Sequence, residues 1–259
     1  MVRDSQPEED APLQVEDDQI VVGTWSADLM ELATVSGDLR SMIRAGKSEE
    51  AQALVQSRSV EEQAALVALD ENPEEILSLT GMDEQGRPGY KPAVVDKLPT
   101  ELLTGLIASR DLKFSRYNAE VLKVMSPKVF VRALNDTLEP VHQADLRVSI
   151  TWDWLQAVAA VGDPIKRAEL LVEADWDVIE DAIVHGLEKI DPGRAVPGAA
   201  AGGFGVSRLQ AMSEGFTGLK PSEIVGDNEI GRMLNVLGDA APEIVGELMM
   251  RAARRVEWM

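Results

Sequence analysis

The hydrophobic and polar positions of the chain repeat at helical spacing, in short stretches that open with recognisable start signals. Ser59 is followed three residues later by Glu62, a capping box in which each side chain accepts a hydrogen bond from the other residue's backbone amide. Prolines follow Asn72, Ser126 and Asp163 at the first helical position, where the missing N–H of proline costs nothing. These signals recur along the chain and predict a succession of short α-helices.

An apolar pair follows many of these prolines within the first helical turn. Pro73, Pro99 and Pro221 each precede a glutamate and then two aliphatic residues. Such a pair seats the first turn of a short helix on a neighbour, and short helices need that packing because they are unstable alone. The prolines are unequally spaced, so the pattern is not a strict repeat. The sequence predicts an all-α fold, an array or superhelix of short helices; a closed four-helix bundle is the alternative.

Two segments depart from this helical pattern. Residues Leu146 to Trp152 alternate with period two, which is typical of a strand. The same segment also fits a helix from Trp152 to Val161 with Thr151 as its cap, and both interpretations stay open. Residues Met82 to Lys91 contain glycines and a proline, which predict a loop.

Composition divides the chain into four parts. Residues 1–19 hold seven acids, one arginine and few apolar side chains, which predicts a disordered acidic tail. Residues 20–190 carry most of the helical pattern and form the predicted main helical domain. Glycine, alanine and proline dominate residues 191–206, which predicts a linker. Residues 207–259 then form a small C-terminal helical unit.

The charge of the chain limits its partners. It has 45 acidic and 25 basic residues, a formal net charge of −20. Such a field repels nucleic acid and anionic lipid, so we expect no nucleic-acid partner. It attracts protein subunits with basic surfaces, or divalent cations, although solubility alone is the simpler explanation of the acidity.

Several classes of chemistry are excluded by residue type. The chain has no cysteine, which rules out disulfides, cysteine-bound zinc and thiol nucleophiles and fits a reducing cytosol. We find neither a signal peptide nor an apolar stretch of about 20 residues, so we predict a cytoplasmic protein without membrane insertion. The glycines of residues 202–205 lack the Lys-Ser/Thr of a phosphate-binding loop, and we expect no cofactor.

One helix face groups residues that can bind a metal. Asp181, His185 and Glu188 follow one another at i, i+4 and i+7, which places all three on the same side of a helix. A divalent metal site or an acid–base pair could use this face. The alternative is a solvated helix surface.

Three tryptophans lie close to acidic residues, namely Trp152, Trp154 and Trp176. Large rings beside charges can bind a partner surface. At helical spacing the same rings also serve as core residues.

The C-terminal segment is locally basic in an acidic chain. Arg251, Arg254 and Arg255 precede Trp258 near the end of the last predicted helix. Cations at this end are favoured by the helix dipole. The functional interpretation is a helix that binds a partner through these arginines and Trp258.

The helix starts "NPEEIL", "LPTELL" and "SPKVFV" resemble the acidic N-terminal helical domain of MgtE-type magnesium transporters and the helical arrays of the flagellar switch protein. The resemblance covers at most Ser36 to about Ala182. The chain departs from the transporters because no transmembrane segment and no nucleotide-sensing domain follow. The resemblance implies a soluble regulatory or scaffold module that packs against other subunits, and no metal-binding residue is carried over.

These observations lead to a predicted function. The leading hypothesis is a non-enzymatic helical scaffold or regulatory protein of a bacterial-type cytoplasm that acts through protein–protein interaction. A divalent-cation-responsive regulator or a metal-dependent hydrolase is the second hypothesis. A structural subunit of a larger assembly, with the C-terminal helix as its plug, is the third.

Overall fold

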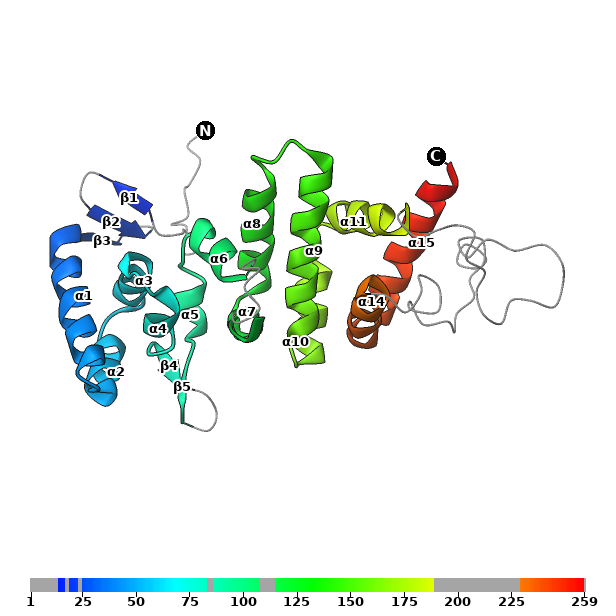
Figure 1. Cartoon of the computed structure of the whole chain (residues 1–259). Helices are drawn as coiled ribbons and strands as arrows, with labels where there is room; N and C mark the ends of the chain where they lie inside the picture. Colours follow the sequence, from blue (N-terminus) through cyan, green and yellow to red (C-terminus); the bar gives the residue numbers. More distant parts are fainter. Residues whose placement is uncertain are drawn as a thin grey trace, which may run out of the picture. The chain divides into compact units, whose positions relative to one another are not determined.

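The computed structural model describes residues 14–16, 19–22, 25–82, 86–107, 115–188 and 229–258 (Figure 1). Most of them are helical and the sheets are small, which confirms the all-α class. The chain separates into two compact units, Met1–Ala133 and Leu134–Met259, and the boundary falls inside helix α8. Within the described ranges, none of the helices is both long and apolar enough to cross a membrane.

The first unit begins with a three-stranded antiparallel sheet of order β1-β2-β3. Its strands are β1 (Gln14–Glu16), β2 (Gln19–Val22) and β3 (Trp25–Asp28). Ile20 at the centre of this sheet is fully buried. β1 lies inside residues 1–19, the segment that we expected to be a disordered tail. Its backbone pairs with that of β2, which gives these three residues a strand conformation. Residues 1–13 lie outside the described residues.

Short helices make up the rest of the first unit. They are α1 (Leu29–Arg44), α2 (Ser48–Gln56), α3 (Val60–Leu69), α4 (Pro73–Leu77), α5 (Pro92–Val95), α6 (Thr100–Ile107), α7 (Ser115–Val124) and the first half of α8 (Pro127–Leu138). α1 packs on α2 and α3, α3 packs on α4 and α5, and α7 packs on α5 and α6. Helices that lie close together along the chain thus cover one another, as the short apolar faces require.

The predicted loop between residues 82 and 91 contains a small antiparallel pair, β4 (Gly81–Met82) with β5 (Pro88–Gly89). A side chain at Gly81 would approach the backbone of Lys91 to 3.1 Å, so a glycine fits this close crossing. Gly86 has a φ of 74°, which only glycine adopts readily.

The second unit packs five described helices around an aliphatic core. They are α9 (Ala144–Ala160), α10 (Pro164–Glu173), α11 (Trp176–Glu188), α14 (Glu229–Ala240) and α15 (Pro242–Trp258). α9 packs on α10, α11 and α14, and α15 packs on α11 and α14. The two C-terminal helices therefore belong to the same compact unit as α9 to α11. The predicted linker 191–206 lies outside the described residues.

Of the two interpretations left open for Leu146 to Trp152, the strand is wrong, because the whole segment belongs to α9. The helix begins at Ala144, so Thr151 lies within it rather than at its cap. The Thr151 hydroxyl donates to the Arg147 carbonyl at 3.0 Å, which satisfies a polar side chain inside a helix.

The predicted helix starts are largely confirmed. Ser59 and Glu62 form the reciprocal capping box at the start of α3. The Asp163 carboxylate accepts from the Ile165 amide, and the Ser126 hydroxyl accepts from an amide of α8. At Asn72 the proline follows as predicted, but the asparagine side chain makes no cap hydrogen bond.

Candidate functional site

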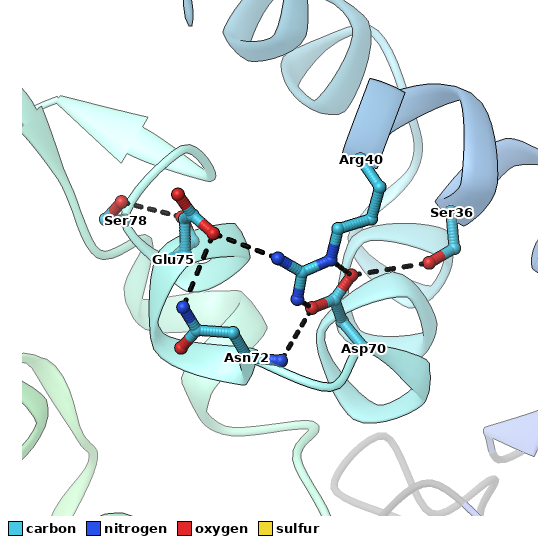
Figure 2. Close-up of polar contacts among 6 residues, drawn as sticks. All are labelled: Ser36, Arg40, Asp70, Asn72, Glu75 and Ser78. Atoms are coloured by element: carbon cyan, nitrogen blue, oxygen red, sulfur yellow. Dashed lines mark hydrogen bonds and ion pairs between the residues drawn. The ribbon is translucent and has the colours of Figure 1, made fainter. Parts of the chain in front are cut away.

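The first unit contains a polar cluster that joins three of its helices, here called the Arg40 cluster: Ser36, Arg40, Asp70, Asn72 and Glu75 (Figure 2). Ser36 and Arg40 stand one turn apart on α1, so they share a face of that helix. Asp70 is the C-cap residue directly after α3, and Glu75 lies in the first turn of α4. The end of α3, the start of α4 and one face of α1 therefore meet at the Arg40 guanidinium.

Arg40 binds both carboxylates of the Arg40 cluster. Its Nε donates to Asp70 Oδ2 at 2.9 Å, and its Nη2 pairs with Asp70 Oδ1, which makes a two-pronged contact. Its Nη1 donates to Glu75 Oε2 at 3.0 Å. The Asp70 side chain is 1% exposed and the Arg40 side chain 20%. The pair is thus largely shielded from water, where its electrostatic attraction is stronger than at the surface.

Two further donors complete the environment of Asp70. The Asn72 amide donates to Asp70 Oδ1 at 2.8 Å, and the Ser36 hydroxyl donates to Oδ2 at 3.4 Å. Each carboxylate oxygen therefore accepts from two donors, and a carboxylate has about four such positions in all. All acceptor positions of Asp70 are therefore used in contacts that join α1, α3 and the start of α4. This arrangement suits a structural tie better than a general base or a metal ligand.

The second unit has a smaller polar contact, here called the Arg251 cluster: Asp177, Glu180 and Arg251. Arg251 on α15 pairs through Nη2 with Asp177 Oδ1 and through Nε with Glu180 Oε2, both at 2.7 Å. The Glu180 side chain is 5% exposed, whereas that of Asp177 is 82% exposed. α11 and α15 (yellow and red in Figure 1) are joined at this point.

The structure places the predicted partner-binding residues in different environments. Trp154 is fully buried, whereas Trp152 and Trp176 are half-buried. Arg251 pairs with acids of its own chain. The side chains of Arg254, Arg255 and Trp258 lie outside what the structure describes, although their backbone belongs to α15.

The predicted metal-binding face lies on α11, as its spacing requires. Asp181 is exposed, but the side chains of His185 and Glu188 lie outside the described residues. Across the part of the chain that the structure describes, no three His, Asp or Glu residues gather as a metal ion needs. The metal site therefore stays a prediction.

Two glutamates have pKa values shifted in opposite directions. The Ser59 backbone amide and hydroxyl, with nearby Arg58, lower the pKa of Glu62 in the capping box. Burial raises the pKa of Glu74 in the first turn of α4. Both shifts belong to helix starts, and neither group lies in an assembled catalytic arrangement.

An apolar surface on α10 was not predicted from the sequence. Ile165 is 70% exposed and Val172 54% exposed, although both are large aliphatic side chains. They stand seven residues apart, two helical turns, with half-buried Ala168 between them. These three residues are called the α10 outer face. A helical projection of residues 164–173 could have found it, because Leu170 and Leu171 point to the opposite side and are buried.

The chain was compared with protein-family models, curated proteins and solved structures, and none of them matches it. The resemblance to the MgtE-type and flagellar-switch helical domains therefore remains a prediction. The class of the protein is defined by its own architecture, two compact units that are each built mainly of helices.

Proposed function

We propose that the protein is a non-enzymatic helical scaffold or regulatory protein that acts through protein–protein contacts in the cytoplasm. The α10 outer face is the observation that supports this function best. Two large aliphatic side chains on one helix face are exposed, with charged residues beside them. Exposed apolar groups rimmed by polar ones are typical of surfaces that bind another protein.

The polar clusters support the same proposal. The Arg40 cluster joins three helices and the Arg251 cluster joins two, so their acids serve the fold. The charge of −20 favours subunits with basic surfaces over nucleic acid as partners. The cysteine-free composition suits a reducing cytoplasm.

Site-specific photo-cross-linking in the native cell tests this function. A photoreactive amino acid replaces Ile165, and the matched control replaces Met30, an exposed side chain of α1 in the other unit. The expected result is a discrete adduct above the 28.2 kDa chain from position 165 that position 30 does not give. The proposal fails if position 165 gives no adduct, or if both positions give the same pattern.

A further inference from the structure

The charges beside the α10 outer face are mostly negative and accessible. Glu169 and Glu173 stand one turn apart along one flank of the face, and both are exposed. Asp163 before the helix and Asp175 after it are exposed as well. Carboxylates thus border the exposed pair of aliphatic side chains along its length.

The two bases of α10 offset this negative charge only in part. Lys166 pairs with Glu169 at 3.5 Å, and its side chain is 14% exposed. Arg167 donates through Nη1 to the Val161 carbonyl at 3.1 Å, which directs it toward the end of α9. An approaching partner therefore meets apolar side chains flanked by an excess of carboxylates.

We propose that the α10 outer face binds a basic amphipathic helix of a partner protein. This inference rests on the proposed function and names its partner class. A helix with aliphatic residues at i, i+3 or i+4 and i+7 would cover Ile165 and Val172, which lie at the matching two-turn spacing. Lysine or arginine on the flank of that helix would pair with Glu169 and Glu173, so charge complementarity sets its orientation.

A synthetic peptide provides the probe. It has about 18 residues, five helical turns, with leucines on one face and lysines on the flanks. Two comparison peptides keep the leucines and replace the lysines by glutamates, or scramble the sequence at constant composition. Binding of each labelled peptide to the full chain is followed by fluorescence anisotropy at low and at physiological salt.

Two pairs of variants separate apolar from charge contributions. I165Q together with V172Q should weaken binding of the basic peptide roughly tenfold, and the matched control M30Q should leave it unchanged. E169Q together with E173Q should weaken it about threefold at low salt, and less when salt screens the pairs. E49Q together with E50Q on α2 removes the same charge from exposed positions elsewhere and should have a smaller effect than the α10 pair.

The outcomes distinguish this inference from the broader function. If the scrambled peptide binds as well, or if the α2 and α10 charge variants behave alike, binding follows the overall charge and the inference is overturned. If the acidic peptide binds the α10 outer face more tightly, the inference is wrong but a protein-binding surface remains. If no peptide binds, the inference is overturned. The proposed function is then removed only by the cross-linking result, either no adduct from position 165 or the same pattern from positions 165 and 30.

Discussion

Removing Arg40 should strongly destabilise the first unit. R40A leaves the Asp70 carboxylate in place, 1% exposed and without its guanidinium. Breaking a buried ion pair from one side usually costs about 3–5 kcal/mol, because an unpaired charge stays buried. Arg40 is 20% exposed and Asp70 keeps the Asn72 amide as a donor, so we expect the lower end, about 3 kcal/mol.

Urea denaturation followed by circular dichroism measures this loss. With a slope of about 2 kcal/mol per molar, a loss of about 3 kcal/mol lowers the unfolding midpoint by about 1.5 M. Four of the five tryptophans lie in the second unit and Trp25 lies in the first, so in a W25F background tryptophan fluorescence reports the second unit as an internal reference. The matched control is R58A: Arg58 pairs with Glu62 at 3.4 Å near the surface, and its loss should cost no more than about 0.5 kcal/mol.

A double-mutant cycle shows whether Arg40 and Asp70 act as a unit. D70A alone should cost less than R40A, because the remaining arginine keeps Glu75 and reaches solvent. R40A with D70A should cost less than the sum of the two single changes by about 1–3 kcal/mol, since neither charge is left behind. Costs that add to within about 0.5 kcal/mol would refute the reasoning, as would R40A and R58A having equal effects.

Four further predictions concern helix starts, the Arg251 cluster and metals. S59A should cost about 1 kcal/mol at pH 7, because the Glu62 amide loses its side-chain acceptor. The lowered pKa of Glu62 means that its ionised carboxylate stabilises the capping box above the ordinary glutamate value of 4.5 and that this contribution is lost as pH falls through the lowered value; E62Q should therefore lower the urea midpoint at pH 7, and its difference from wild type should shrink as the pH falls below 4.5. Burial raises the pKa of Glu74, so its ionised carboxylate opposes folding above the raised pKa, and this effect is absent below 4.5. E74Q should therefore raise the urea midpoint at pH 7 and leave it unchanged at pH 3. An unchanged midpoint at pH 7 would contradict this. R251A should cost the second unit about 2 kcal/mol by tryptophan fluorescence, and adding E180Q should recover part of the loss if the burial of that carboxylate is the cause. Mg²⁺, Ca²⁺ and Mn²⁺ at equal ionic strength should raise the melting temperature by the same small amount, whereas a rise with one metal alone would favour the site predicted on α11.

The local features of this fold could be predicted from the sequence, because their causes are local. The capping box of Ser59 and Glu62 spans three residues, and the proline-led starts of α4, α8, α10 and α15 are fixed by one residue each. The strand interpretation of Leu146 to Trp152 was wrong because alternation over so few residues does not distinguish a strand from a helix.

The contacts between helices could not be predicted in the same way. Arg40 and Asp70 are thirty residues apart, and Arg251 and Asp177 seventy-four. No local sequence pattern relates residues so far apart. The chain has 45 acidic residues, so the sequence does not show which of them pairs with each arginine. The α10 outer face was accessible to sequence reasoning in principle, but exposure of Ile165 and Val172 depends on which side of α10 packs against α9 and α14.

Both units combine an aliphatic core with an arginine that ties helix to helix. Aliphatic side chains can pack in several alternative ways, because burying them lowers the free energy in any arrangement of about the right volume. Aromatic residues, which would restrict that freedom, make up only 4% of this chain. A buried charge pair tolerates few arrangements, because every misplaced partner leaves a desolvated charge. We infer that Arg40 fixes the position of α1 against α3 and α4, and that Arg251 fixes the position of α15 against α11. The apolar faces of these helices alone would allow more than one position.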